Sequence, residues 1–316
     1  MIACCRSLLL AAAWSAPLAA ALLATAPLLP ARVGAPQEQA APAPITVQRD
    51  ARAAEALGWR LSTQAWTFRD RTAFEVVDVA ARLGLRFVEF FPGQKLSPEQ
   101  PDVGLGPDMG AAALAAFQAK LQAANVKAAS FGVVGFSKDE AAGRKLFEFG
   151  KALGLENFSA EPDPDAFDLL EKLADEYEIK VALHNHPKPS RYWSPDVVLQ
   201  SVKGRSARLG SCSDTGHWTR SGLKPVDCLK QLEGRVIELH FKDLDAFGKH
   251  EACDVPWGGG QSDARGILAE LKRQGFQGLI HVEYETGAGR ELEENVASCI
   301  RFFDDAAREL LGGAGK

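Results

Sequence analysis

A carboxylate and an imidazole stand three residues apart in the segment 209–218, which reads Leu-Gly-Ser-Cys-Ser-Asp-Thr-Gly-His-Trp. Its first residues predict a short strand, and the polar residues after it predict a turn that holds Asp214 and His217. A carboxylate and an imidazole just past a strand end can converge on one metal ion or one substrate oxygen. The alternative is structural, because an aspartate in a turn often accepts hydrogen bonds from its own backbone.

Three further strand-like segments also end in residues that can bind a metal or move a proton. They are residues 181–187, 236–245 and 279–285. They supply His184, His186, His240, Lys242, Asp243, Glu283 and Glu285. Together with Asp214, the histidines and a glutamate form a mixed N/O ligand set. This set suits Mn²⁺, Zn²⁺, Co²⁺ or Mg²⁺, and the lack of a thiolate disfavours a closed structural zinc site.

An N/O site with open positions can hold two oxygens of a hydroxy-ketone and stabilise the enediolate left when a base removes the α-proton. Lys242 lies two residues after His240, so we expect it to reach the substrate or a nearby carboxylate. We expect only one of Glu283 and Glu285 to point inward and favour Glu283, because its strand ends there. Asp243 is equally suited to cap a loop.

Strand-like and helix-like segments alternate from residue 61 onward, and this alternation predicts the scaffold. Strands are predicted at residues 61–66, 86–91, 126–134, 157–160, 180–183, 209–213, 236–241 and 279–283. Helices are predicted at residues 72–84, 110–124, 137–154, 165–177, from 194 onward, 225–232, 263–275 and 292–311. Thr72 with Glu75, and Ser137 with Glu140, match a capping box.

Strict alternation implies parallel strands, and eight strand–helix units predict an α/β fold, a closed (β/α)8 TIM barrel. An open doubly wound sheet is the alternative, but no G-x-G-x-x-G follows the first strand. Barrel active sites form at the C-terminal strand ends. We therefore predict substrate contacts from Gln64, Trp66, Glu89, His186, Trp218 and Trp257. The aromatic side chains are equally suited to pack in the core.

The N-terminal residues predict export. Arg6 precedes a Leu/Ala-rich, uncharged run over residues 7–29, and small-residue cleavage patterns follow at 24–26 and 33–35. We predict a cleaved signal peptide over residues 1–35 and a periplasmic or secreted protein. A single membrane anchor is the alternative, because the run is long enough to span a bilayer. A linker is predicted over residues 36–56 and one barrel domain over residues 57–316.

The composition is that of a globular protein with a full core, since 46% of the 316 residues are hydrophobic and 24% are charged. Loss of residues 1–35 removes Arg6 and Arg32 and no acid, so the net charge changes from −5 to −7. An acidic chain without a basic run is not expected to bind nucleic acid. Of the four remaining cysteines, none in a C-x-x-C pair, we expect Cys212 and Cys228 to be buried apolar residues.

At these residues the chain resembles the xylose isomerase-like TIM-barrel superfamily, which holds sugar isomerases and epimerases, inosose dehydratases and metal-dependent AP endonucleases. The resemblance covers about residues 61–311. It rests on five motifs: Leu-His-Asn-His at 183–186, Asp-Thr-Gly-His at 214–217, Leu-His-Phe-Lys-Asp at 239–243, Val-Pro-Trp-Gly-Gly-Gly at 255–260 and Val-Glu-Tyr-Glu at 282–285.

The resemblance implies a metal-dependent enzyme acting on a small sugar. The family's metal ligands are a glutamate on the fifth strand, an aspartate on the sixth, a histidine on the seventh and a glutamate on the eighth. Carried over, the ligands are His184 in place of the first glutamate, then Asp214, His240 and Glu283. His217 matches a substrate-contacting histidine, and the residues assigned to catalysis are Glu283, Lys242, His217 and Glu161.

His184 departs from the family pattern, because the epimerases use both metal-bound glutamates as an acid/base pair. The change shifts the expectation toward isomerisation or β-elimination, and Glu161 is placed to supply the missing carboxylate or to cap the next helix. The expected function is an exported, divalent-metal-dependent sugar isomerase/epimerase acting α to a ketone. The alternatives are a lyase or dehydratase of a keto-sugar or 3-keto-glycoside, and a non-catalytic sugar-binding barrel.

An AP endonuclease is disfavoured. That reaction predicts additional histidine ligands on the second and third strands, where Glu89 and Ser130 with Phe131 stand instead. The sequence leaves the sugar, the metal and the oligomeric state open.

Overall fold

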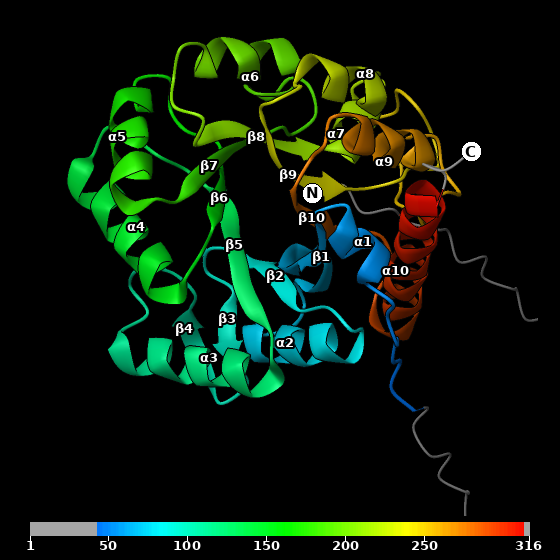
Figure 1. Cartoon of the computed structure of the whole chain (residues 1–316). Helices are drawn as coiled ribbons and strands as arrows, with labels where there is room; N and C mark the ends of the chain where they lie inside the picture. Colours follow the sequence, from blue (N-terminus) through cyan, green and yellow to red (C-terminus); the bar gives the residue numbers. More distant parts are fainter. Residues whose placement is uncertain (1–42, 313–316) are drawn as a thin grey trace, which may run out of the picture. The chain divides into compact units, whose positions relative to one another are not determined.

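The computed structural model describes residues 43–312. From Ile45 onward the described chain forms one unit, in which eight parallel strands close into a barrel in the order β1-β10-β9-β8-β7-β6-β5-β2 (Figure 1). The prediction of a (β/α)8 barrel is confirmed. The predicted signal peptide, residues 1–35, lies outside the described residues.

The barrel strands all lie within two residues of their predicted positions. They are β1 (Trp59–Gln64), β2 (Phe87–Phe90), β5 (Lys127–Val134), β6 (Asn157–Ala160), β7 (Lys180–His184), β8 (Leu209–Asp214), β9 (Val236–Phe241) and β10 (Gly278–Val282). Short apolar runs bounded by turns are reliable strand signals when every strand is covered by a helix, because both faces are then buried.

The helices between the strands also follow the predicted order. They are α2 (Ala73–Arg82), α3 (Ala111–Ala124), α4 (Glu140–Leu153), α5 (Phe167–Tyr177), α6 (Pro195–Val202), α8 (Pro225–Gln231), α9 (Ala264–Arg273) and α10 (Gly289–Gly312). The capping box of Thr72 and Glu75 is confirmed. The second predicted box is wrong, because Asp139 rather than Ser137 caps α4 and accepts the N–H groups of Ala141 and Ala142.

Several short elements were not predicted. They are α1 (Arg52–Ala56), the 3-10 helix η1 (Ala65–Phe68), the hairpin of β3 (Lys95–Ser97) and β4 (Gln100–Gly104), and α7 (Thr215–Arg220). Elements of this length carry too few residues for a periodic apolar pattern to reveal them. The α7 helix replaces the turn that was expected after Asp214.

The predicted linker over residues 36–56 is shorter than expected. Ile45 and Val47 pack against the hydrophobic core, and α1 lies beside α10 (Figure 1). The guanidinium of Arg49 binds Asp304 of α10 through two hydrogen bonds of 2.6 and 3.2 Å. These residues therefore belong to the folded unit.

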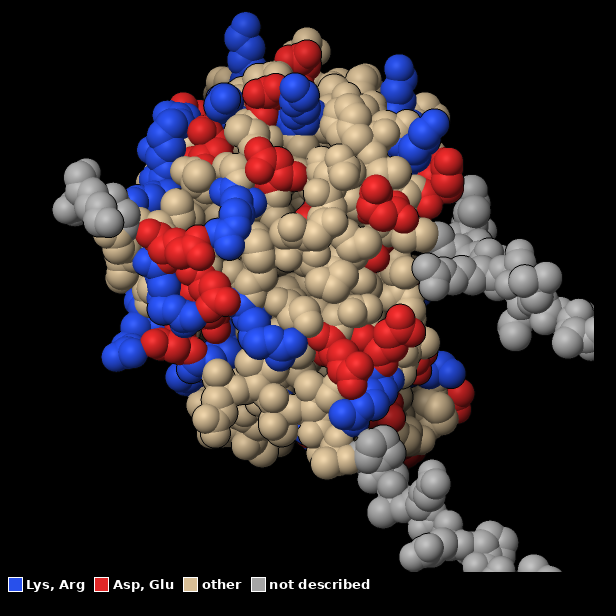
Figure 2. Space-filling view, turned by 90° about the vertical axis from the view of Figure 1, so that its right-hand side faces the viewer, with Lys and Arg blue, Asp and Glu red and all other residues tan. Residues whose placement is uncertain are grey.

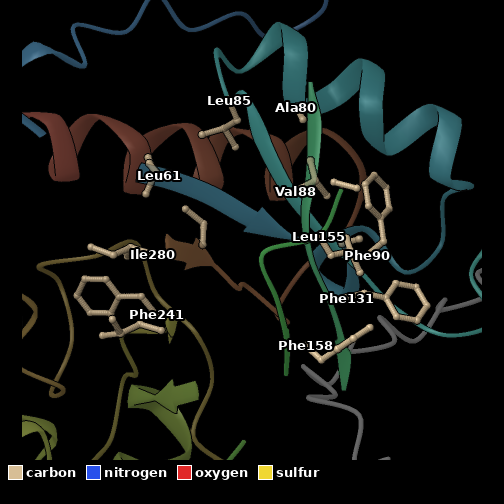
Figure 3. Packing of buried hydrophobic residues seen from close by; sticks show 14 of the residues in the cluster. Leu61, Ala80, Leu85, Val88, Phe90, Phe131, Leu155, Phe158, Phe241 and Ile280 are labelled. Carbon is tan, nitrogen blue, oxygen red and sulfur yellow. The ribbon is translucent and has the colours of Figure 1, made fainter. Parts of the chain in front are cut away.

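Apolar side chains fill the space between strands and helices. Leu61 and Ile280 stand opposite each other on neighbouring strands (Figure 3). Phe90 packs edge-on against Phe117 of α3, with 5.0 Å between ring centroids. Cys212 and Cys228 are free and buried, as expected.

The centre of the barrel is polar. Glu238 and His281 are fully buried, with 2.8 Å between their Oε2 and Nε2 atoms, and His281 Nδ1 lies 2.9 Å from Ser62 Oγ. Glu238 also contacts Ser130 and Asn157. This buried network lies one layer of inward-facing residues below the C-terminal strand ends.

Charges of both signs are interspersed on the face shown in Figure 2. Arg290 pairs with Glu294 within α10, and Arg265 of α9 pairs with Glu309 of α10. Among residues 43–312, no helix combines the length and apolarity needed to cross a bilayer.

Replacement of Arg49 by alanine should lower the free energy of unfolding by about 2–3 kcal/mol, because it leaves the Asp304 carboxylate, 8% exposed, without its partner. The matched control is Arg52→Ala, whose side chain is 87% exposed and whose pair with Asp50 should contribute little to stability. Urea unfolding measures both. Equal losses would contradict a structural role for residues 45–51.

Candidate active site

The four predicted metal ligands converge at the C-terminal end of the barrel. One ligand atom from each of His184, Asp214, His240 and Glu283 lies within 4.8 Å of the others. Strand register explains this convergence, because His184 stands opposite Cys212, two residues before Asp214, and Asp214 stands opposite His240. Glu283 follows the end of β10, next to β9.

The donor atoms suit a divalent cation. His184 Nε2 and His240 Nδ1 are buried and make no hydrogen bond to any described residue, whereas Glu283 Oε2 pairs with the ammonium of Lys242 at 2.8 Å. His240 Nδ1 and Glu283 Oε2 are 3.0 Å apart but lack the alignment of a hydrogen bond. Buried polar atoms are normally satisfied, so two such ring nitrogens beside the carboxylates of Asp214 and Glu283 indicate a ligand there. Two imidazoles and two carboxylates form an N/O set that Zn²⁺, Mn²⁺ or Co²⁺ would accept.

A second carboxylate orients each of the two histidine ligands. His184 Nδ1 lies 3.3 Å from Glu161 Oε1, and His240 Nε2 lies 2.7 Å from Glu89 Oε2. Such contacts decide which ring nitrogen faces the metal. Burial works to raise the pKa of Glu161, but hydrogen bonds from His184 and His186 outweigh it and hold the pKa at about 2. Glu161 is therefore ionised and lies behind His184 rather than replacing it.

Glu89 does not reach the substrate cavity, contrary to expectation. Its side chain is fully buried and contacts His240 and Ser159. Glu89 points into the barrel as predicted, but it stands one layer too low. Its role is to support His240.

Asp214 serves both purposes that the sequence left open. Its Oδ1 accepts the N–H of His217 at 2.7 Å and so caps α7. Its Oδ2 faces the site, 3.6 Å from His184 Nε2 and 3.5 Å from His217 Nε2. Burial would raise the pKa of Asp214, but the ammonium of Lys242 outweighs it and holds the pKa well below its usual range.

Lys242 is a fully buried cation that joins the two carboxylate ligands. Its Nζ lies 2.7 Å from Asp214 Oδ2 and 2.8 Å from Glu283 Oε2. Burial works to lower the pKa of Lys242, but Asp214, Glu283 and Glu285 outweigh it and raise the pKa above its usual range. Lys242 therefore reaches carboxylates and does not line the cavity.

The glycine of the Asp-Thr-Gly-His motif makes room for this lysine. A Cβ on Gly216 would lie 2.6 Å from Lys242 Cβ and 2.8 Å from Lys242 Cδ. Any side chain at position 216 would push the ammonium away from Asp214.

His217 is held as a neutral hydrogen-bond donor. Arg220 Nη1 lies 3.1 Å from His217 Nδ1, and because arginine only donates, Nδ1 accepts and Nε2 keeps the proton. Burial, helped by Lys242, lowers the pKa of His217 well below its usual value, although Asp214 acts in the opposite direction. Arg220 was missed in the sequence because α7 was interpreted as a turn, in which residues three apart need not meet.

A cavity of about 260 Å³ opens beside the ligand atoms. Its lining residues are Gln64, Trp66, Phe91, Pro92, Gly132, Val133, His184, His186, His217, Glu283 and Glu285. All its titratable side chains come from the β7, α7 and β10 side. The opposite wall, from β1, β2 and β5, presents one amide and apolar groups. The predicted contacts Gln64, Trp66 and His186 all line the cavity.

Glu285 also lines the cavity, so the expectation that only one of the two glutamates faces inward is wrong. Residues two apart point to the same side of an extended chain, and both glutamates lie beyond the last residue of β10. Glu285 Oε2 pairs with Arg220 at 3.1 Å.

Trp218 and Trp257 are core residues, contrary to their predicted contact with substrate. Trp218 is fully buried on α7, where consecutive side chains point about 100° apart, so it turns away when His217 faces the cavity. Trp257 stacks on Phe241 with 4.1 Å between ring centroids.

Asp243 caps the loop that carries Trp257. Its carboxylate accepts the N–H groups of Gly258, Gly260 and Ser262 at 2.9–3.0 Å. The loop-cap interpretation of Asp243 is therefore confirmed.

Residues 77–306 match the family described as xylose isomerase-like TIM barrel. The chain belongs to this family. The rhizopine catabolism protein MocC of Rhizobium meliloti is 29% identical over 133 residues, a match covering 37% of this chain and 40% of MocC. The match thus spans less than half of that relative.

Several solved structures have a similar fold. A protein from Parabacteroides distasonis is 31% identical, with a TM-score of 0.64, over 78% of this chain and 99% of its own. A D-tagatose 3-epimerase-like protein is 16% identical, with a TM-score of 0.62, over 81% of this chain and 100% of its own. The IOLI protein, whose structure contains a zinc atom, is 19% identical, with a TM-score of 0.60, over 79% of this chain and 99% of its own.

Glu161→Gln and Glu89→Gln should each weaken metal binding by about 10- to 100-fold, because each removes the carboxylate that orients a histidine ligand. Isothermal titration with Mn²⁺ or Zn²⁺ measures this. Glu285→Gln is the control, since Glu285 lines the cavity but orients no predicted ligand, and it should bind metal like the unmodified protein. Unchanged affinity in both test variants would contradict the proposed roles of Glu161 and Glu89.

Lys242→Met should lower the melting temperature in EDTA and enlarge the increase that Mn²⁺ produces. The variant leaves Asp214 and Glu283 buried without their cation, so an added cation has more repulsion to relieve. Differential scanning fluorimetry with and without metal measures the two shifts, and Lys249→Met, at an exposed position, is the control. An unchanged metal-induced shift would show that the lysine does not offset the ligand charge.

Proposed function

We propose that this protein is an exported, divalent-metal-dependent enzyme that moves a proton α to a ketone of a sugar, with isomerisation as its reaction. One observation carries the proposal. Four ligand atoms, two of them imidazole nitrogens without a hydrogen-bond partner among the described residues, converge beside a cavity whose acid/base groups stand next to them on one wall. The family's name and the zinc in a protein of the same fold agree with it.

A divalent cation at this point would act as a Lewis acid that polarises a ketone oxygen. The chain's own groups would handle the proton. Burial acts to raise the pKa of Glu283, but Lys242 and His240 outweigh it and lower the pKa, so Glu283 is ionised and open to the cavity. His217 would donate its Nε2–H to a substrate oxygen. Lys242 and Glu161 act through Glu283 and His184 and are positioning residues.

The titratable side chains lie on one wall of the cavity, and this placement bears on the type of reaction. An epimerase that works with two bases needs proton-transfer groups on both faces of the substrate. The wall formed by Trp66, Phe91, Pro92 and Val133 offers none. Isomerisation needs only one face, because one base can remove a proton and return it to the neighbouring carbon.

A lyase acting on a keto-sugar or 3-keto-glycoside is the second candidate. The same one-sided wall supports it, since a base and an acid on one face suit elimination of a leaving group from that face. His186, half-exposed and bound to Glu161, is placed to give a proton to the leaving group. A non-catalytic sugar-binding barrel is less well supported, because it has no need of unsatisfied buried ligand atoms.

Incubation of Mn²⁺-loaded protein with keto-sugars in D₂O tests the proposal. A product of unchanged carbon skeleton that carries solvent deuterium indicates isomerisation, and loss of water or of an alcohol indicates a lyase. Asp214→Ala should lose metal and bring turnover to the background rate, because the variant removes a ligand and the cap of α7 together.

If Asp214→Ala keeps full metal content, the assigned ligand set is wrong. If no keto-sugar is converted with metal supplied, the enzyme proposal fails. N-terminal sequencing of the extracytoplasmic protein tests export, and a start near residue 36 is expected.

A further inference from the structure

A second cavity, of about 370 Å³, adjoins the first and shares Pro92 and Val133 with it. It lies at the same end of the barrel, between the end of β5, the loop before α4 and the first turns of α4. Its lining residues are Pro92, Pro107, Phe131, Val133, Val134, Gly135, Phe136, Ser137, Asp139, Ala142, Gly143 and Leu146. The first cavity alone is small for a ligand site, which commonly spans about 300–1,000 Å³.

The walls of the second cavity are apolar and held in place. Phe131 packs edge-on against Phe149 at 5.1 Å, and Phe136 contacts the rings of Phe147 and Phe158 at 5.6 and 6.0 Å. Both lining phenylalanines are buried. The cavity is therefore preformed by rigid aromatic packing.

The polar side chains that line this cavity, Ser137 and Asp139, are exposed and stand at its rim. The Asp139 carboxylate caps α4, and Ser137 Oγ accepts the N–H of Asp139. The carbonyls of Val134 and Phe136 accept the N–H groups of Glu161 and Asp163 at 2.9 and 2.8 Å. A sugar ring placed against Phe131, Phe136 and Leu146 would bury hydroxyl groups away from the polar rim, which costs free energy, whereas an aromatic ring has no polar group to bury there.

We propose that the second cavity is a subsite for an aromatic substituent joined to the sugar that occupies the first cavity. The substrate is then bipartite, an aryl glycoside rather than a free monosaccharide. This inference rests on the proposed function for its sugar half only. Pro92 and Val133 line both cavities, so the two halves of such a substrate would lie on either side of these residues.

Two substitutions fill the subsite from its rim without disturbing the core. Ala142 is exposed, and a Cβ on the exposed Gly135 would meet no atom within 4 Å. The test variants are Ala142→Trp and Gly135→Leu. Ala141→Trp is the matched control, because Ala141 is an exposed neighbour on α4 that does not line the cavity.

Calorimetry compares phenyl and methyl glycosides of 3-ketoglucose. The unmodified protein and Ala141→Trp should bind the phenyl compound at least about tenfold more tightly, because the ring's apolar surface is removed from water. Either test variant should bring the ratio near one and leave the methyl compound unaffected. A ratio near one in the unmodified protein would overturn the subsite.

EDTA separates this inference from the proposed function. One outcome is that EDTA leaves the affinity for both glycosides unchanged while the preference for the phenyl compound persists and is lost in Ala142→Trp. In that case the proposed function fails and the subsite stands. If neither glycoside binds, phenol is titrated alone. No saturable binding of phenol to the unmodified protein would overturn the subsite, and binding that Ala142→Trp abolishes would support it.

Discussion

The buried ammonium of Lys242, held between Asp214 and Glu283, is the contact on which the active site depends. Two carboxylates out of water cost on the order of several kcal/mol each unless opposite charge compensates them. Lys242 lies within 2.8 Å of both, so the site can remain assembled around a stable charge balance. Gly216 is the local condition for this contact, because a Cβ there would collide with the lysine stem.

A layer of buried polar residues beneath the site connects the predicted ligands to the centre of the barrel. Contacts run from Glu238 to His281, from His281 to Glu89, from Glu89 to His240 and from His240 to Glu283. Each imidazole is thus fixed by a carboxylate before a metal binds. Polar residues take the place of apolar ones in this barrel centre. Their contacts fix the orientation of the imidazole rings, and a site with histidine ligands needs that orientation.

His184 stands at the position where the family resemblance implies a glutamate. A carboxylate is still present nearby, because Glu161, just after the neighbouring strand β6, lies 3.3 Å from the ring. The negative charge is therefore kept next to the site but moved out of the ligand set. The acid/base groups consequently gather on one wall, opposite Trp66 and the apolar residues that lead to the second cavity.

Much of the fold and part of the site could be read from the sequence alone. The strand positions followed from short apolar runs. The predicted ligands His184, Asp214, His240 and Glu283, which the structure brings together, came from polar residues at the ends of those runs and from the family motifs. These features are local, because side chains two apart share a face and strand ends in a parallel barrel share one edge.

Only the tertiary structure decided where each side chain lies along the barrel axis and which residues face it across the barrel. Glu89 proved to lie one layer below the cavity, Trp218 to face the core, and Arg220 to fix the tautomer of His217. Residues 45–56 looked like a linker, yet Arg49 meets Asp304 across the folded unit. Height depends on the stagger between strands, and partners such as Glu89 and His240 are 151 residues apart, so no local pattern encodes them.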